Sequence, residues 1–482
     1  MSKIENIWRQ LISPTKTKII INEILNHKKA IIDPSLSARI EYLERNLLAA
    51  LSKKDGEEIK KTLISLMLAC DNRPIQLNQL IKKIYNQIKA DHKSLLDKVI
   101  LDVNHDEDLF NERKKRSLAS SRRLMNRHSV VPNSCDIICK AANEGAYISE
   151  FIHHHLNQGF RNIYVGVNND SSGLTGKIIE RINEFYPCVH LINTDADNAK
   201  HGSNGTYCRL FEEVSKTSDS SHGLVIDVDE TWIAALQHLS ISDFISNERS
   251  FDILSLNWIN LCGGERFAKP MEIESCNASF SKEIKSIFSY NQPIVELRDH
   301  VPFLDNTDNR TIIHRTGDRS DLEAKQINPI YIPRRKLRRQ AKPYKTRAWI
   351  LHRRIRSELE YSSRLFQRKA SNSKGSIPFK ENRNGYNDHI NNSKAKEIAV
   401  KVCQPNREQL SNIMPPLHEF QEKCNITQLI DKAREECTES TILKKIDQLN
   451  LNDVRIHESV WRRTFQGTRF LKKLEERLEF EG

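Results

Sequence analysis

The 482-residue chain has no hydrophobic run that approaches the ~18 apolar residues of a membrane span. Its first residues, Met1–Trp8, lack the apolar core of a signal peptide. Ten cysteines are scattered without a CxxC pair or a zinc-ligand spacing, which is typical of a reduced, cytosolic protein. These absences predict a cytoplasmic protein.

The sequence also lacks a repeat of fixed period, which argues against a solenoid. No aromatic-interleaved RNA motif or zinc module accompanies its basic residues, so we expect no nucleic-acid partner. Hydrophobic residues make up 38% and charged residues 29%, and the length suits about three domains of ~150 residues.

The basic residues are unevenly placed. The formal net charge is +12, and residues 334–356 alone hold eleven Lys and Arg and no acid. One interpretation of this run is a solvated linker or helix face. The other is a binding surface for an anionic acceptor or for an anionic membrane, which would place the protein peripherally at the inner face of the membrane.

Three regions separate along the chain: 1–130, 131–330 and 331–482. The first predicts helices, at Ile19–Leu25, Leu36–Leu51, Glu57–Leu68 and Ile75–Ile88. The basic clusters Arg113–Arg116 and Arg122–Arg123 end this region as an expected linker. The last region predicts the basic linker, a flexible polar stretch over 370–395, and helices rich in Glu and Lys.

Short apolar segments alternate with helical patterns in the middle region. The expected strands are Cys135–Cys139, Ile163–Val167, Val189–Ile192 and Leu224–Asp227. The expected helices between them are Tyr147–Gln158, Gly176–Phe185 and Tyr207–Ser215. This alternation predicts an α/β domain whose parallel strands are joined by helical crossovers.

Two carboxylates, Asp227 and Asp229, end the apolar run Leu224–Ile226. In an extended chain this i, i+2 spacing places both side chains on one face. Ligands of open α/β sheets gather beyond the carboxyl ends of the strands. Oxygen donors there suit Mg²⁺ or Mn²⁺ holding a phosphorylated substrate, whereas an exposed Asp-rich turn is the plain structural alternative.

Polar loops follow the first two expected strands. Asn143 and Glu144 follow the first, and Asn169 and Asp170 follow the second, where Gly173 permits a tight turn. Each loop alone is most often only a turn. Together with the carboxylate pair, they predict a nucleotide crevice at one edge of the sheet.

Several of these motifs occur in a familiar order. They are Asn143-Glu144, Glu150–Phe160, Ile163–Val165, Asn169–Ser172 and Asp227–Glu230, followed more loosely by Trp258, Gly263-Gly264, Lys285–Phe288, His300–Pro302 and Ile312–His314. Over about 134–330, the chain resembles prokaryotic family-2-like glycosyltransferases with an Asp-x-Asp-Glu motif.

This resemblance implies an α/β fold of the GT-A-like (Rossmann-like) type, with a mainly parallel sheet and helical N- and C-terminal flanking regions. It implies transfer, with inversion, of a hexosyl-type sugar from a nucleotide-sugar donor, a UDP-sugar first, to a saccharide or lipid-linked acceptor in capsule or surface polysaccharide synthesis. The residues assigned to the metal are Asp227, Asp229 and His314; those assigned to the donor are Asn143, Glu144, Asn169, Asp170 and Asp227. Catalytic candidates are Asp229 and, for the general base, Glu265, Asp299, His300 or Asp305, with Glu230 supporting the metal site.

The three consecutive histidines His153–His155 point in different directions on a helix and cannot converge on one metal. We therefore interpret them as structural residues.

Two other functions fit the same residues. Asp227–Thr231 also resembles the Asp-x-Asp-x-Thr motif of haloacid-dehalogenase-like phosphatases, with Asp227 as nucleophile, Asp229 as acid/base and Gly317–Asp321 as a later acidic motif. Three strand–helix units before Asp227, and the polar stretch before Asp318, count against it. In the third interpretation the chain is a non-catalytic adaptor, against which the intact aspartate pair argues.

Overall fold

The structure is a computed structural model of the chain. It describes residues 34–56, 58–60, 62–63, 83–84, 90–234, 240–248, 250–305, 312–316, 321–324, 348–367, 379–380, 383–410 and 414–480. The chain divides into two compact units, Met1–Glu112 and Arg113–Gly482. None of the described helices is long and apolar enough to cross a membrane.

The first unit is helical where it is described. Helix α3 spans Pro34–Lys53, which confirms the helix predicted at Leu36–Leu51. Its Leu47 and Leu51 are buried, as are Ile59 and Leu63 farther along the chain. The helix predicted at Ile19–Leu25 lies outside the described residues, as do parts of those predicted at 57–68 and 75–88. Helix α6, Ala90–Met125, begins in this unit and ends in the second.

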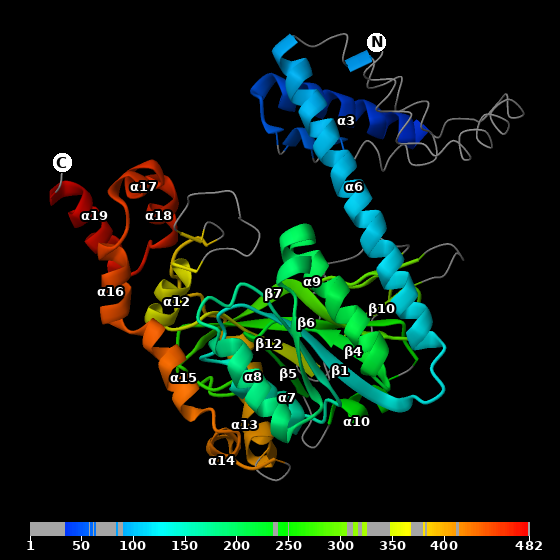
Figure 1. The fold of residues 1–482 in the computed structure, drawn as a ribbon, viewed down its shortest axis with the longest axis vertical. Coiled ribbons are helices and arrows are strands. Elements are labelled where there is room, and N and C mark those ends of the chain that lie inside the picture. Colours follow the sequence, from blue (N-terminus) through cyan, green and yellow to red (C-terminus); the bar gives the residue numbers. More distant parts are fainter. Residues whose placement is uncertain are drawn as a thin grey trace, which may run out of the picture. The chain divides into compact units, whose positions relative to one another are not determined.

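The second unit is built on a mixed sheet between helices (Figure 1). The strands of this unit are β1 Val131–Ala141, β2 Ile163–Val167, β3 Val189–Asn193, β4 Ser220–Val225, β5 Glu230–Ala234, β6 Ile253–Cys262, β7 Asn277–Ser289, β8 Ile294–Glu296, β9 Phe303–Leu304, β10 Ile312–Thr316, β11 Asp321–Ala324 and β12 Ala348–Ile355. The main sheet has the order β11-β10-β6-β7-β4-β1-β2-β3, with β12 pairing β5 and β6. Strands β1 to β4 pair in parallel, while β7 runs antiparallel to β4 and β6.

The α/β prediction and the mostly parallel sheet are therefore confirmed, and the four predicted strands and three predicted helices of the middle region are found. The three predicted helices are α7 Ile148–Asn157, α8 Leu174–Phe185 and α9 Asp195–Thr217, and the short helix α10 Ile241–Ser246 was not predicted. Strand β4 ends at Val225, so Asp227 lies outside it, whereas the sequence predicted that the strand extends to Asp227.

Side chains of β1 alternate between two apolar cores. Ile137 packs with Ile152 of α7 and Ile178 of α8 on one face. Ile138 packs with Leu210 of α9 on the other face. Strands buried on both faces explain the continuous apolar runs by which the sequence predicted them.

The basic cluster at the end of the first predicted region is not a linker. Arg113 and Arg116 lie in α6, where Arg113 Nε donates to Glu296 at 3.1 Å and Arg116 donates to Glu212 at 2.6 Å and Asp197 at 2.9 Å. The sequence shows the charges, but the acids that pair with them come from distant segments.

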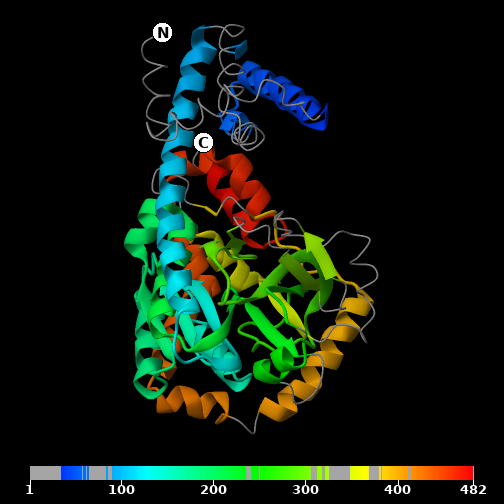
Figure 2. The same cartoon turned by 90° about the vertical axis from the view of Figure 1, so that its right-hand side faces the viewer.

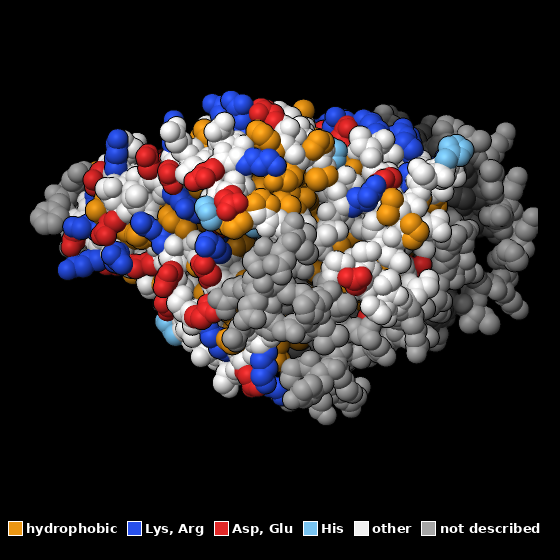
Figure 3. Space-filling view, turned by 90° about the horizontal axis from the view of Figure 1, so that it is seen from below, with side chains coloured by type: hydrophobic (Ala, Val, Ile, Leu, Met, Phe, Trp, Pro, Cys, Tyr) orange, Lys and Arg blue, Asp and Glu red, His pale blue; other side chains and the backbone are white. Residues whose placement is uncertain are grey.

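The C-terminal region wraps round the sheet (Figure 2). Its helices are α12 Glu358–Leu365, α13 Ser393–Leu410, α14 Leu417–Lys423, α15 Thr427–Arg434, η1 Glu435–Cys437, α16 Glu439–Asp447, α17 Leu451–Ile456, α18 Glu458–Thr464 and α19 Phe470–Phe480. Helix α13 contacts β7, α14 contacts α7, and α15 contacts α8. On the face seen in Figure 3, acidic and basic side chains of the described residues are interspersed.

Residues 334–347 of the basic run lie outside the described residues, and the remainder is not a solvated linker. Strand β12 inserts between β5 and β6 with Trp349 buried. Arg353 Nη2 donates to the carbonyls of Lys269 and Glu272, and Arg356 is only 6% exposed. These two arginines are therefore occupied within the protein.

The three histidines of α7 have separate partners, which confirms their structural interpretation. His153 Nε2 bonds to the carbonyl of Pro415 and His154 Nε2 to that of Trp232, both at 2.9 Å. His155 Nδ1 bonds to the carbonyl of Phe151 at 2.8 Å, and its Nε2 accepts the N–H of Trp232 at 3.3 Å. The His155 ring can make both bonds only in its neutral form.

The buried histidines predict a loss of stability in acid. Burial lowers the pKa of His154 to about 4, against ~6.5 in an unfolded chain. Between these two pKa values the unfolded state binds a proton at His154 and the folded state does not. The free energy of unfolding therefore has its full value above pH ~6.5 and falls as the pH drops toward 4. For this residue the loss is on the order of 3 kcal/mol. Urea unfolding at pH 7 and pH 5 should show a smaller difference for His154→Gln than for the unchanged chain.

His389→Gln is the control, because that side chain is 80% exposed. Its pH difference should equal that of the unchanged chain. An equal pH difference for His154→Gln and the unchanged chain would contradict the burial argument.

Candidate active site

The two loops after β1 and β2 are tied to each other. Asn143 Oδ1 accepts from the backbone N–H of Ser171 at 2.9 Å and from its hydroxyl at 2.8 Å, while Asn143 Nδ2 donates to the Asn169 carbonyl at 3.2 Å. Both asparagines have positive φ, 55° and 48°, a conformation that asparagine tolerates better than most residues. The loops therefore open at the same sheet edge, as predicted.

Asp170 shapes the start of α8. Its Oδ1 accepts from Thr175 Oγ1 at 3.0 Å and its Oδ2 from the Gly176 N–H at 3.1 Å. Gly173 before the helix has φ 67°, the left-handed conformation expected for that turn. Asp170 thus holds its loop in shape while facing the pocket beside it.

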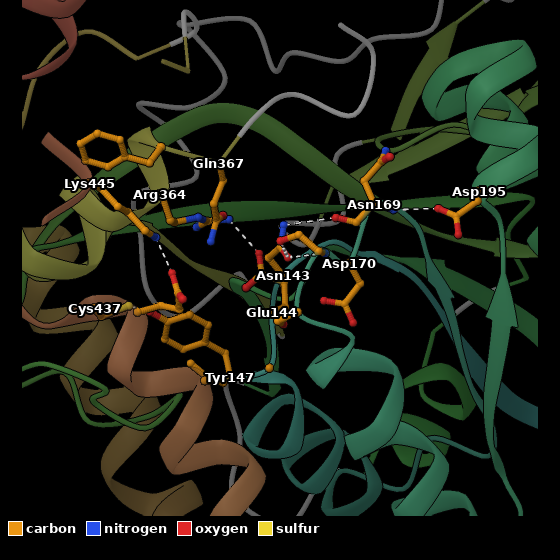
Figure 4. A pocket seen from close by; sticks show the side chains of 17 residues that line it. Asn143, Glu144, Tyr147, Asn169, Asp170, Asp195, Arg364, Gln367, Cys437 and Lys445 are labelled. Atoms are coloured by element: carbon orange, nitrogen blue, oxygen red, sulfur yellow. Dashed lines mark hydrogen bonds and ion pairs between the residues drawn. The ribbon is translucent and has the colours of Figure 1, made fainter. Parts of the chain in front are cut away.

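A pocket of about 720 Å³ opens beside these loops (Figure 4). Asn143, Glu144, Tyr147, Asn169, Asp170 and Asp195 line it from the α/β part of the chain, and Arg364, Gln367, Cys437 and Lys445 line it from the C-terminal region. The cleft predicted beside Asn143 and Asp170 is present. The sequence did not indicate that α12, η1 and α16 of the C-terminal region form its opposite wall.

Asp227 and Asp229 lie in a turn between β4 and β5, which corrects the prediction of an extended pair. The Glu230 N–H donates to the Asp227 carbonyl at 3.0 Å, and the Asp227 N–H donates to Glu230 Oε2 at 2.9 Å. The turn directs the two aspartates to different cationic partners. Glu230 holds the shape of the turn, which is consistent with its predicted supporting role.

Lys285 of β7 is the cationic partner of Asp227. The ammonium lies 3.2 Å from Asp227 Oδ2 and 3.1 Å from Glu230 Oε2, and it donates to the Asp299 carbonyl at 2.7 Å. Lys285 and Glu230 are fully buried, whereas the Asp227 side chain is 34% exposed. Burial by itself would raise the pKa of Asp227, but the charges of Lys285 and Lys140, together with the hydrogen bond from Lys285, hold that pKa below its usual value. Asp227 is therefore ionised and accessible.

Arg364 of α12 is the partner of Asp229. Its Nη1 donates to Asp229 Oδ2 at 3.1 Å and its Nη2 to Glu144 Oε1 at 2.9 Å. Burial works against ionisation of Asp229, yet the charge of Arg364 keeps its pKa far below the usual range. Arg364 thereby joins the pocket, through Glu144, to the aspartate turn.

His352 of β12 also approaches Asp229. Its Nε2 lies 3.9 Å from Asp229 Oδ1, and its Nδ1 lies 3.2 Å from Asn260 Oδ1. Burial lowers the pKa of His352 to about 4, so the imidazole is neutral near pH 7. Arg364 and His352 both lie beyond the span of the family resemblance, and no spacing in the sequence connects them to Asp229.

His314 does not lie beside this turn. Its backbone in β10 pairs with Ile253 at the start of β6, whereas His352 pairs with Asn260 near the end of that strand. Seven residues of β6 separate the two positions, about 23 Å along the strand. The side chain of His314 itself is outside the described residues, as are residues 317–320 of the rival acidic motif.

The candidate general bases are divided in position. Asp299 and His300 are half-buried near Lys285: the Asp299 carbonyl accepts from its ammonium, and the His300 ring lies 5.5 Å from that of Trp258. Glu265 is exposed in the loop after β6, and Asp305 is half-buried after β9. None of these four residues lines the pocket beside Asn143.

The ligands available to a divalent cation are the carboxylate oxygens of Asp227 and Asp229. Each of these carboxylates already lies beside a positively charged side chain of the protein. Within the described ranges, no three His, Cys, Asp or Glu side chains are grouped so as to hold a metal ion. Asp227 and Asp229 are ionised, oxygen-bearing and on one turn, which is chemistry suited to Mg²⁺ or Mn²⁺. The pair fits such an ion in chemical type.

No protein-family model matches this chain, and no curated protein has a sequence that matches it.

The buried Lys285 cluster predicts a large stability effect. Lys285→Met leaves Glu230 and Asp227 without their cation, which should cost about 3–5 kcal/mol of unfolding free energy, as measured in urea. Adding Glu230→Gln should recover part of that loss, because a neutral amide needs no counter-charge.

Lys216→Met is the control, because Lys216 also forms an ion pair, with Glu213, but its side chain is 47% exposed. It should change stability by no more than about 0.5 kcal/mol. If Lys285→Met were as mild, the cluster would not hold the turn together.

Proposed function

We propose that this chain is a glycosyltransferase that moves a sugar from a nucleotide-sugar donor to a saccharide or lipid-linked acceptor. The observation that carries the proposal is the 720 Å³ pocket at the ends of β1 and β2, joined through Glu144 and Arg364 to the ionised Asp227–Asp229 turn. A volume of this size suits a cofactor-sized ligand. The GT-A-like fold and a role in surface polysaccharide synthesis rest on the sequence resemblance alone.

The residues divide the donor between them. Asn143, Asn169 and Asp170 offer amide and carboxylate groups to a nucleoside in the pocket. Asp227 and Asp229 would hold a divalent cation, Mn²⁺ or Mg²⁺, whose chemistry is to neutralise the charge of the departing diphosphate. His352, neutral and 3.9 Å from Asp229, is better placed than His314 to assist them.

The reaction is a displacement at the anomeric carbon. The acceptor oxygen forms the new bond to that carbon as the bond to the diphosphate oxygen breaks and its electron pair leaves with the nucleoside diphosphate. The acceptor proton must pass to a base within hydrogen-bond reach. This single displacement inverts the configuration.

His300 is the base that the hydrogen bonding favours. Its Nδ1 lies 2.8 Å from the Ile284 carbonyl, which can only accept, so Nδ1 carries the proton and Nε2 is left with a lone pair. The Trp258 ring lies close to both the His300 ring and the Lys285 ammonium, so His300 is on the Lys285 side of the turn. Exposed Glu265 has no comparable positioning.

Asp227→Asn should abolish donor turnover. With a panel of UDP-sugars and other nucleotide sugars in Mn²⁺, release of nucleoside diphosphate should fall by at least ~100-fold, since a charge that serves the leaving group is lost. Exposed Asp431→Asn should leave turnover unchanged.

The same assays separate the alternatives. Turnover of an aryl phosphate, but of no nucleotide sugar, would instead identify a phosphatase with Asp227 as nucleophile. Absence of any turnover, together with no thermal shift by any nucleotide, would favour the adaptor.

His300→Gln should lower kcat for transfer to an acceptor by about 10²–10⁴-fold, because glutamine can still donate to the Ile284 carbonyl but cannot take a proton at neutral pH. The KM for the donor should stay the same. Glu265→Gln and Asp299→Asn are the comparison variants. If one of these loses kcat while His300→Gln keeps it, that carboxylate is the base.

A further inference from the structure

Basic side chains from the C-terminal region gather beside the aspartate turn. Arg356 follows β12, Arg364 lies in α12, and Lys380 and Arg383 follow in the chain. Electrostatic interactions couple Lys380 to Arg364, Arg383, Glu144 and Asp229. Arg356 ends the basic run 334–356, for which anion binding was one interpretation, whereas Arg364, Lys380 and Arg383 were not candidates in the sequence, because only tertiary packing brings them to Asp229.

The nearby acids are already engaged. Glu144 Oε1 accepts from Arg364, and its Oε2 lies 3.6 Å from Arg356 Nη1. Asp229 Oδ2 also accepts from Arg364. Within the described part of the chain, no carboxylate forms an ion pair with Lys380 or Arg383. The cluster therefore holds more positive charge than its acids balance.

Phe379 and Lys380 are fixed against neighbouring helices, α12 among them. The Lys380 N–H donates to the Leu365 carbonyl at 2.8 Å, immediately after Arg364. The neighbouring Phe379 ring packs on Phe366 at 6.1 Å and on Phe465 at 5.6 Å. Lys380 is thus held in place by backbone and neighbouring aromatic contacts, rather than by an acidic partner.

The like charges disfavour one another. Burial, together with the charges of Arg364 and Arg383, lowers the pKa of Lys380 to about 7. Burial and the charge of Arg364 lower the pKa of Arg383 as well. Partly buried cations without counter-charges are unfavourable, and a bound anion would relieve them.

We propose that Arg364, Lys380 and Arg383 form an anion site that receives the diphosphate of the donor. Guanidinium groups match phosphate oxygens with paired hydrogen bonds, and an ammonium adds a point charge. Arg364 also lines the pocket, so a nucleoside there would extend its diphosphate toward these cations. The identity of the ligand rests on the proposed transferase function. In that function, the positively charged side chains of the site stabilise the charge of the leaving group.

Binding of inorganic pyrophosphate to the full-length chain in excess EDTA tests the site, because the chelator removes any divalent cation. Calorimetry should detect binding to the unchanged chain. Lys380→Gln/Arg383→Gln should weaken binding at least about tenfold, through the loss of two charged contacts. Lys394→Gln/Lys432→Gln removes the same charge from exposed positions and should leave the affinity within about twofold.

Equal affinity of the Lys380→Gln/Arg383→Gln variant and the unchanged chain, or no binding to the unchanged chain, would overturn the site. Lys380→Arg keeps the charge and should keep the affinity. Should the double variant fail to fold, Arg383→Gln alone decides the question, and it should bind pyrophosphate more weakly than Lys380→Arg.

Donor kinetics keep the two proposals apart. Pyrophosphate binding that depends on Lys380 and Arg383, without turnover of any nucleotide sugar, would leave the anion site standing and refute the transferase. Turnover with an unchanged donor KM in Lys380→Gln/Arg383→Gln would refute the anion site and leave the transferase standing.

Discussion

The guanidinium of Arg364 holds the site together. It bonds at once to Glu144, at the end of β1, and to Asp229, in the turn after β4, and it is carried by α12 more than 130 residues later in the chain. An arginine with two carboxylates on its two nitrogens fixes three segments relative to one another. The pocket wall from the C-terminal region and the aspartate turn are therefore parts of one arrangement.

A second buried ion cluster gives the turn its shape. Buried Lys285 lies between Asp227 and Glu230, while Glu230 accepts the backbone N–H of Asp227. Each of the two aspartates is thus paired with a different cation. A phosphorylated ligand at this turn meets carboxylates and protein cations together, and this is the basis on which we propose leaving-group stabilisation by the C-terminal basic residues.

Much of the sheet could be predicted from the sequence, because strands buried on both faces must be apolar throughout, as in Ile163–Val167. The Asn143 and Asp170 loops followed from the same reasoning, since the ends of neighbouring parallel strands meet at one edge. The aspartate pair was misplaced by local reasoning. A two-residue spacing predicts one face only in an extended chain, and the Glu230 side chain folds that segment into a turn.

The remaining errors have a common cause in long-range pairing. The arginines of α6 predicted a linker because their partners, Glu212 and Glu296, are distant in the sequence. His352 and Arg364 reach Asp229 only because β12 inserts between β5 and β6, and no local pattern indicates that insertion.

The most direct test of the central claim is a crystal structure of the chain with a nucleoside diphosphate, UDP first, and Mn²⁺. We expect the nucleoside between Asn143 and Arg364, with the diphosphate extending toward the Asp227–Asp229 turn. A nucleotide bound elsewhere, with the pocket beside Asn143 empty at saturating UDP, would contradict it.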